Sequence, residues 1–155
     1  MDLSFSKVEL EFRKEIRSWL RENVPDEPLE SFDTEPGFQQ HRDWEKTLYA
    51  GNWGMVTWPK EYGGQGKSAI EQFIFYDETM LVGSPAPMLT INTVGPTIME
   101  YGTDEQKDYF LPKIAAGKLH FCIGYSEPDA GTDLASLTTK AVRDGDEYVI
   151  NGQKT

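Results

Sequence analysis

The sequence holds little of several residue types that mark common kinds of protein. Its single cysteine, Cys122, excludes an intramolecular disulfide and any metal site built from several cysteines. No apolar run approaches the roughly 20 residues that cross a bilayer. The first residues, Met1 to Ser4, lack the basic and then apolar layout of a signal peptide. We therefore expect a cytoplasmic protein that makes no membrane contact.

Basic residues are also few, since 15 Lys and Arg stand against 26 Asp and Glu for a formal net charge of −11. This balance excludes nucleic acid as a partner, because phosphate contacts need Lys and Arg on one face. It leaves small anionic ligands open, because backbone N–H groups can hold a phosphate inside an acidic protein. His41 and His120 are isolated from other potential ligands, so we predict no metal site.

The first two thirds of the chain show the apolar spacing and start signals of helices. Capping boxes are predicted at Ser6 with Glu9, at Ser68 with Glu71 and at Thr103 with Gln106. The spacing predicts helices over about 6–21, 38–50, 68–81, 88–101 and from 103 onward. We expect Pro112 to kink or split the last of these, because it supplies no N–H. Between the second and third helices, residues 51–66 combine tryptophans with glycines, which predicts a packed, ordered loop.

The hydrophobic period changes at Leu119. Strands are predicted over 119–125, 137–142 and 147–150, with turns at Asp144-Gly145 and Asn151-Gly152. Cys122 falls in the first of these strands and is expected in the core. Helices followed by strands indicate an α+β chain of two layers or domains, in which the second is expected to be incomplete at Thr155.

Two segments have compositions typical of ligand loops. Residues 62–68 end in Gly-Lys-Ser before a helix, as a P-loop does, but Glu61 stands where that motif needs glycine. A glycine turn that leads into a capped helix is therefore the better interpretation. Residues 126–133 place small residues, hydroxyls and three acids after a strand. Their spacing does not fit a calcium loop, and nothing sets Glu127 and Asp129 across a cleft as glycoside hydrolysis requires. The remaining interpretation is a loop of free N–H and O–H donors, suited to a phosphate or the edge of a polar heterocycle.

Four stretches of the chain resemble one family, in order and spacing. They are Trp58-Pro59-Lys60-Glu61-Tyr62-Gly63-Gly64-Gln65-Gly66, Tyr101-Gly102-Thr103-Asp104-Glu105-Gln106-Lys107 with residues 110–117, the loop Tyr125 to Ser136, and Gly145-Asp146-Glu147-Tyr148 with Asn151-Gly152-Gln153-Lys154. Together they resemble the acyl-CoA dehydrogenase family across nearly the whole chain. The resemblance implies an all-α N-terminal domain at 1–118, then the beginning of an antiparallel β-barrel-like middle domain at 119–155. The family's C-terminal helical domain is expected to be absent from this sequence.

The resemblance also implies an FAD site. Residues Ile123 to Thr132 would form one wall of it, with Ile123, Tyr125, Ser126, Gly131 and Thr132 as its cofactor-binding residues. Ser126 would bond the flavin pyrimidine edge through its hydroxyl and backbone. Thr132 would approach the FAD pyrophosphate and the pantetheine of the substrate. Glu127 and Asp133 would shape the loop, and neither is expected to be the catalytic base.

The activity implied is α,β-dehydrogenation of an acyl-CoA thioester, with hydride transfer to FAD and electrons passed to an electron-transfer flavoprotein. In the family the glutamate that removes the α proton belongs to the C-terminal helical domain, so no catalytic residue is expected in this chain. A homotetramer or a heterotetramer with like-folded chains is expected. The alternative is a non-catalytic subunit that contributes an FAD wall to another chain.

Two positions depart from the family signature. Asp129 stands where glycine is usual, and Tyr125 stands where a small aliphatic residue is usual. Both changes alter the predicted FAD wall, by charge and by volume. They indicate a less typical branch that acts on steroid side-chain or branched acyl-CoAs.

Overall fold

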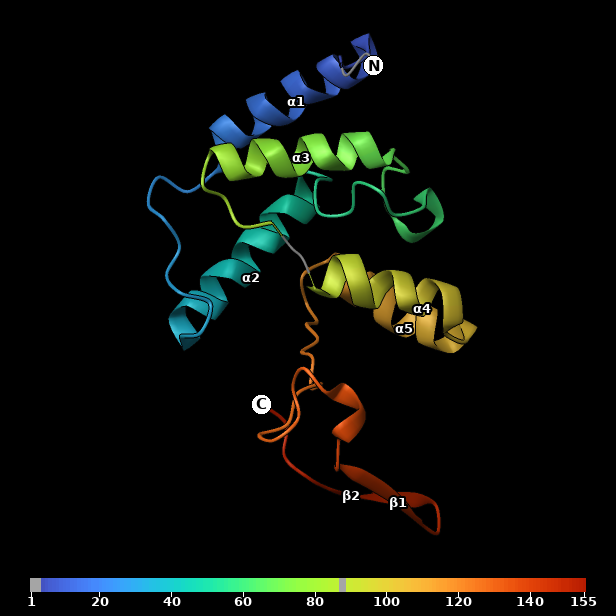
Figure 1. The fold of residues 1–155 in the computed structure, drawn as a ribbon. Helices are drawn as coiled ribbons and strands as arrows, with labels where there is room; N and C mark the ends of the chain where they lie inside the picture. The colour runs from blue at the N-terminus through green and yellow to red at the C-terminus, as the bar shows by residue number, and fades with distance from the viewer. Residues whose placement is uncertain (1–3, 87–88) are drawn as a thin grey trace. The chain divides into compact units, whose positions relative to one another are not determined.

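The computed structural model describes residues 4–86 and 89–155 and divides into two compact units (Figure 1). The first unit, Met1–Phe121, contains the α-helices, and the second, Cys122–Thr155, contains a β-hairpin and a long loop. The predicted α+β class is confirmed: a helical region precedes a short antiparallel hairpin. The predicted domain boundary after residue 118 stays a prediction.

Helix α1 spans Lys7–Asn23 and has the predicted capping box, in which the Ser6 and Glu9 side chains bond each other's backbone N–H groups. Its buried residues recur every four positions at Phe12, Ile16 and Leu20. Helix α2 spans Glu35–Ala50. It begins three residues before the predicted start, because the Thr34 hydroxyl caps the Gly37 N–H and a proline fits the first turn.

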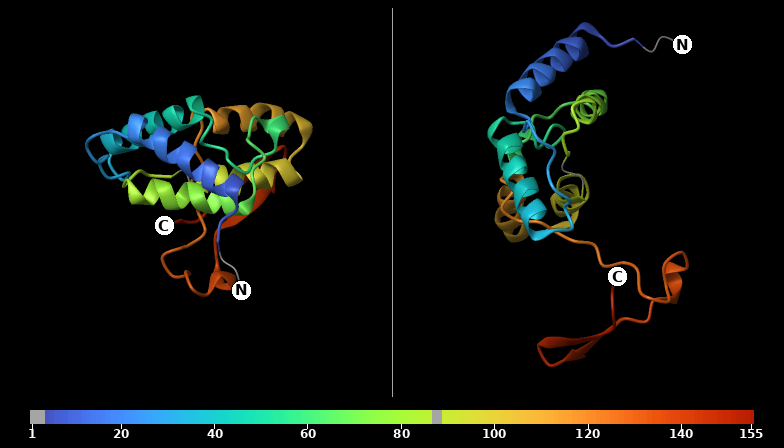
Figure 2. Two further views of the ribbon diagram at one scale, coloured as in Figure 1. Left: turned by 90° about the horizontal axis from the view of Figure 1, so that it is seen from above. Right: turned by 90° about the vertical axis from the view of Figure 1, so that its left-hand side faces the viewer.

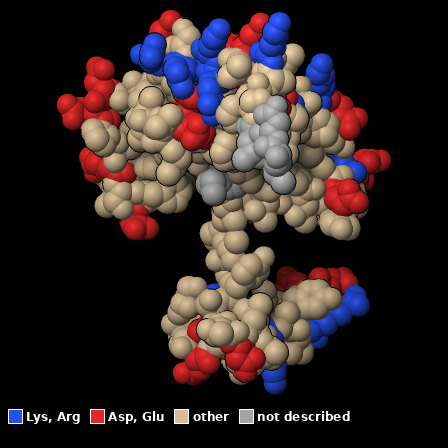
Figure 3. Space-filling view, turned by 45° about the horizontal axis from the view of Figure 1, so that its top comes forward, with Lys and Arg blue, Asp and Glu red and all other residues tan. Residues whose placement is uncertain are grey.

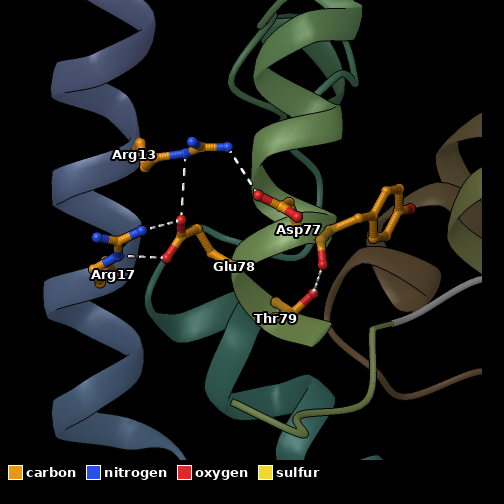
Figure 4. A network of polar contacts seen from close by, with 6 residues as sticks. Arg13, Arg17, Asp77, Glu78 and Thr79 are labelled. Carbon is orange, nitrogen blue, oxygen red and sulfur yellow. Dashed lines mark hydrogen bonds and ion pairs between the residues drawn. The ribbon is translucent and has the colours of Figure 1, made fainter. Parts of the chain in front are cut away.

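Helix α3 spans Ala69–Leu81 and opens with the predicted capping box of Ser68 and Glu71. It packs beside α1 (Figures 1 and 2). Ion pairs cross between the two helices (Figure 4). Arg17 donates two hydrogen bonds of 2.7 Å to the buried carboxylate of Glu78, and Arg13 bonds Asp77 at 2.8 Å. This network fixes how the two helices face each other.

The loop between α2 and α3 is packed, as predicted. Trp53 and Val56 belong to an apolar cluster with α1, α2 and α3. Met55 and Trp58, each two residues further along, belong to a second cluster with the later helices. The loop therefore joins two cores, and burial of its aromatic rings favours a single conformation.

The second cluster is built on α4, Gly95–Tyr101, and α5, Asp104–Ala115, which lie side by side. A π-helical turn, Thr90–Val94, leads into α4, and the predicted helix start at Met88 lies outside the described residues. The Trp58 indole N–H donates to the Ile91 carbonyl within this turn at 2.9 Å. A Cβ added at Gly95 would lie 2.1 Å from the Trp58 ring, so glycine is needed for this close approach.

Pro112 does not split the last helix, because α5 includes Pro112 and continues to Ala115, and the alternative of a kink stays a prediction. An interior proline costs about 3 kcal/mol. Leu111 and Ile114 are both almost fully buried beside it. Each such side chain contributes about 1.5–3 kcal/mol, which offsets the loss.

The second unit contains strands β1, Lys140–Asp144, and β2, Glu147–Asn151, paired antiparallel from Lys140–Asn151 to Asp144–Glu147. The turn predicted at Asp144-Gly145 lies one residue later, at Gly145-Asp146, because Asp144 still pairs with Glu147 as the end of β1. The strand predicted over 119–125 was wrong, and the one predicted over 137–142 begins three residues late. A strand needs a neighbour for its backbone groups, and among the described residues β1 and β2 pair only with each other. For the same reason Asn151-Gly152 does not begin a second hairpin. Cys122, expected in the core, is exposed.

The charges of the helical unit are unevenly spread. Figure 3 shows blue Lys and Arg side chains gathered near the top, where Figure 1 places α1. Helix α1 carries Lys7, Arg13, Lys14, Arg17 and Arg21. Acidic side chains surround this region, so the net charge of −11 is not uniform over the surface.

Candidate cofactor-binding loop

The candidate site is the segment 123–132, called here the site loop, in the second unit. At its centre Glu127 and Ala130 exchange backbone hydrogen bonds of 2.8 and 3.1 Å, which closes a tight turn over Pro128 and Asp129. The second position of a turn favours proline, because the proline ring already fixes φ near the value that the turn needs. Asn52 is the non-glycine residue with positive φ among those described. Asp129 therefore fills the place of the usual glycine without left-handed backbone.

The Glu127 side chain connects the turn to the residues just before β1 and to Lys154. Although the hairpin unit is largely exposed, this carboxylate is only 5% exposed. It accepts the Thr138 N–H at 2.7 Å, the Thr138 hydroxyl at 3.0 Å and the Thr139 N–H at 2.9 Å. It also pairs with Lys154 Nζ at 3.0 Å. Buried carboxylates persist where donors satisfy their oxygens in this way.

The same surroundings set the acidity of Glu127. The Thr139 side chain, the backbone N–H groups of Thr138 and Thr139 and the Lys154 ammonium hold the pKa of Glu127 well below its usual range, against the opposing effect of burial. A carboxylate stabilised this strongly is a weak proton acceptor. Its contacts make it a residue that shapes the loop.

Two further bonds join the site loop to the chain after β2. Lys154 Nζ bonds the Tyr125 carbonyl at 3.0 Å, and the Thr155 N–H bonds the Ser126 carbonyl at 3.0 Å. The hairpin therefore brings the residues that follow β2 back beside the site loop that precedes β1. Gly152, just after β2, has φ of +152°, and a Cβ there would lie 2.1 Å from Thr139 Oγ1. Only glycine fits this return path.

The residues predicted to bind the cofactor lie close together in sequence and are accessible to solvent. Ile123 is 44% exposed and Tyr125 61%. Gly131 and Thr132 are exposed, and Ser126 is half-buried. The sequence did not reveal the role of Lys154, Thr138 and Thr139, whose contacts hold these residues in place. The family's Asn-Gly-x-Lys pattern at 151–154 was the available signal for Lys154.

These residues fit a flavin nucleotide by the chemistry of their donors. Within the described residues, the N–H and the hydroxyl of Ser126 have no hydrogen-bond partner, and neither do those of Thr132. Free donors on a loop fixed by a buried carboxylate suit the polar edge of a heterocycle and a phosphate. A Cβ at Gly131 would meet no atom within 4 Å, so the loop surface there is open to a ligand.

Two segments of the first, helical unit are less suited to a ligand than the site loop of the second unit. In the segment 62–68, the N–H groups of Gln65, Gly66 and Lys67 donate to the carbonyls of Met55, Trp58 and Val56. They do not face a phosphate, which agrees with the glycine turn preferred over a P-loop. A surface pocket of about 120 Å³ at 24–29 and 82–85 is small beside the roughly 300 Å³ of typical ligand sites.

Each of the two histidines lies beside one oxygen atom of another residue. Within residues 4–86 and 89–155, no group of three potential ligands could hold a metal ion. His41 Nε2 lies 3.1 Å from the Glu30 carbonyl, and His120 Nε2 lies 3.0 Å from the Glu45 carboxylate without the alignment of a hydrogen bond. In the same part of the chain, no helix has the length and apolar character needed to span a membrane.

Comparison with known proteins places the chain in a family. The profile of the acyl-CoA dehydrogenase N-terminal domain matches residues 6–118. The acyl-CoA dehydrogenase FadE26 of Mycobacterium tuberculosis is 52% identical over 158 residues, which cover 99% of this chain and 40% of the relative.

Solved structures agree with this match. The ChsE4-ChsE5 complex from Mycobacterium tuberculosis superposes with a TM-score of 0.86 at 53% identity, over 99% of this chain and 39% of the matched chain. The Tcur3481-Tcur3483 steroid ACAD superposes with a TM-score of 0.88 at 48% identity, over 99% and 40%. The chain spans about two fifths of the length of these relatives. It belongs to the acyl-CoA dehydrogenase family.

Proposed function

We propose that these residues form the front part of an FAD-dependent enzyme that removes hydrogen from the α and β carbons of an acyl-CoA thioester. The observation that carries the proposal is the site loop. Its Ser126 and Thr132 donors are free, while a buried carboxylate fixes the backbone between them. Family membership makes FAD the ligand that this loop suits best.

The roles proposed for the chain's own residues are those that the family resemblance implies. Ser126 would donate its hydroxyl and N–H to the flavin pyrimidine edge, and the Tyr125 main chain would contribute beside it. Ile123 and Gly131 would line the wall, and Thr132 would bind the pyrophosphate and the pantetheine of the substrate. FAD, when bound, supplies the hydride acceptor. The loop's contribution is to bind and orient that group.

The α proton needs a base other than Glu127. Glu127 is unsuited, because its lone pairs are occupied by donors and its pKa is lowered. We propose that the base comes from other polypeptide, either further along the chain or in a partner. An electron-transfer flavoprotein would then reoxidise the enzyme.

Similarity to a steroid ACAD supports, as the substrate, an acyl-CoA whose acyl group is the side chain of a steroid. ChsE4-ChsE5 and Tcur3481-Tcur3483 each combine two different chains. This supports a heterotetramer of like-folded subunits over a homotetramer. The same observation favours the second candidate function. In it, this chain is a non-catalytic subunit that contributes an FAD wall to its partner.

The test is dehydrogenation of acyl-CoAs by the full-length protein, purified with and without any chain that accompanies it. Native mass and the visible flavin spectrum are recorded on the same sample. We expect bound flavin, bleached by a steroid side-chain acyl-CoA faster than by a straight-chain acyl-CoA of similar size.

A pair of serine variants tests the site loop itself. Ser126→Ala should weaken flavin binding, because it removes a hydroxyl proposed to contact the flavin. Ser136→Ala is the matched control. Ser136 is exposed in the same unit, and its hydroxyl bonds only the Asp133 carbonyl, so its loss should leave flavin binding unchanged. Equal flavin affinity in the two variants would contradict the role proposed for Ser126.

Each outcome separates the candidate functions. Flavin that the full-length chain binds and that substrate bleaches supports the enzyme. Bleaching that appears only with the partner chain, and flavin binding that Ser126→Ala still weakens in that complex, support the non-catalytic subunit. Absence of flavin from every purified form would refute both.

A further inference from the structure

Lys154 holds the site loop at two points. Its ammonium bonds the Tyr125 carbonyl and the Glu127 carboxylate, each at 3.0 Å. Its stem passes Gly124, where an added Cβ would lie 3.4 Å from Lys154 Cγ. Exposed ion pairs contribute little, but this carboxylate is 5% exposed and the lysine side chain 32%. The pair is therefore better shielded from solvent than a surface pair.

The bond to the Tyr125 carbonyl also sets the direction of the next N–H. No cis peptide occurs among the described residues, and in a trans peptide the C=O and the following N–H point to opposite sides. With the Tyr125 carbonyl turned to Lys154, the Ser126 N–H points away from it. That N–H has no partner in the described part of the chain.

The following peptide shows the same arrangement with its N–H occupied. The Thr155 N–H donates to the Ser126 carbonyl, and the Glu127 N–H on the opposite side bonds the Ala130 carbonyl at 2.8 Å. Residues 154 and 155 thus hold two successive carbonyls. The first of the two peptides leaves its N–H free for a ligand.

We infer that Lys154 is a positioning residue for the flavin: by holding the Tyr125 carbonyl and the Glu127 carboxylate, it aims the Ser126 N–H at the cofactor. The inference rests on the proposed function. The inference extends the proposed function, because it assigns the direction of the Ser126 N–H to Lys154, a residue that follows the hairpin and does not itself touch the cofactor.

The test compares Lys154→Met with Lys140→Met in the full-length protein. Both variants lose one lysine charge from the same unit, but Lys140 lies exposed at the start of β1. The FAD dissociation constant is measured by flavin fluorescence on the apoprotein. We expect Lys154→Met to weaken FAD binding about tenfold, as loss of charge-assisted hydrogen bonds predicts. Lys140→Met should bind as the wild type does, and Lys154→Arg should recover part of the loss.

A second measurement needs no variant and so does not depend on a variant's folding. Amide hydrogen exchange is followed in the wild type with and without FAD. The Glu127 amide should be protected in both states, and the Ser126 amide only with FAD. Equal FAD affinity in Lys154→Met, or a Ser126 amide that FAD leaves unprotected, overturns the inference while flavin binding by the wild type upholds the proposed function. A wild type that binds no FAD overturns both.

Discussion

The contact between Trp58 and the π-helical turn gives a prediction that can be worked from the structure. Trp58 is 2% exposed, and its indole N–H donates to the Ile91 carbonyl at 2.9 Å in buried surroundings. Trp58→Phe keeps an aromatic ring but removes the donor. A buried carbonyl without a partner costs about 1–3 kcal/mol, and the smaller ring leaves space as well. We expect the variant to lose about 2 kcal/mol of local stability.

Trp44 supplies a matched control. Its indole N–H donates to the Pro85 carbonyl at 2.8 Å, but that bond is only partly buried. Water can replace the lost donor there, so Trp44→Phe should cost about 1 kcal/mol. Hydrogen exchange of the α4 and α2 amides in the full-length protein reports the two opening free energies separately. Equal losses, or a larger loss for Trp44→Phe, would refute the reasoning.

Three more predictions follow from single contacts. Gly152→Ala should destabilise the hairpin unit by about 1–3 kcal/mol, because its Cβ would overlap Thr139 Oγ1; an unchanged melting temperature would contradict this. The pKa of Glu127 is lowered on folding, so its stabilising contribution is present above the ordinary value of 4.5 and is lost as the pH falls from there through the lowered pKa. Acid titration followed by amide exchange should show this loss, and Glu127→Gln should abolish it. Arg17→Met should loosen α1 more than Glu78→Met does, because it leaves a buried carboxylate behind with a weaker set of partners; exchange in α1 decides the order.

The helices could be predicted because their signals are local. Capping boxes at Ser6, Ser68 and Thr103 and the spacing of apolar residues act within a few positions. The lack of a strand at 119–125 could not be predicted, because a strand depends on a neighbour that can be distant in sequence. The prediction of a split at Pro112 failed for a related reason. Burial of Leu111 and Ile114 outweighs the local preference of proline against a helix interior.

The site loop could be found from its composition and family pattern, but not the contacts that hold it. Glu127 lies 11 residues from Thr138 and 27 from Lys154, and no periodicity links such positions. The contact that Trp58 makes with the π-helical turn was equally hidden, because Trp58 lies 33 residues before Ile91. The donors are visible in the sequence, whereas their orientation is set by non-local hydrogen bonds.

The hairpin therefore matters to the site without contributing a residue that faces the ligand. Lys140 pairs with Asn151, and the chain then passes Gly152 to bring Lys154 and Thr155 back to the site loop. Lys154 follows β2, so a slip of one residue in this register would displace it along the chain direction by about 3.3 Å, out of reach of the site loop. The Tyr125 carbonyl and the Glu127 carboxylate would both lose their cation, and the Ser126 N–H would lose its direction. Because of this dependence, the strand register is as much a part of the proposed flavin-binding geometry as the loop itself.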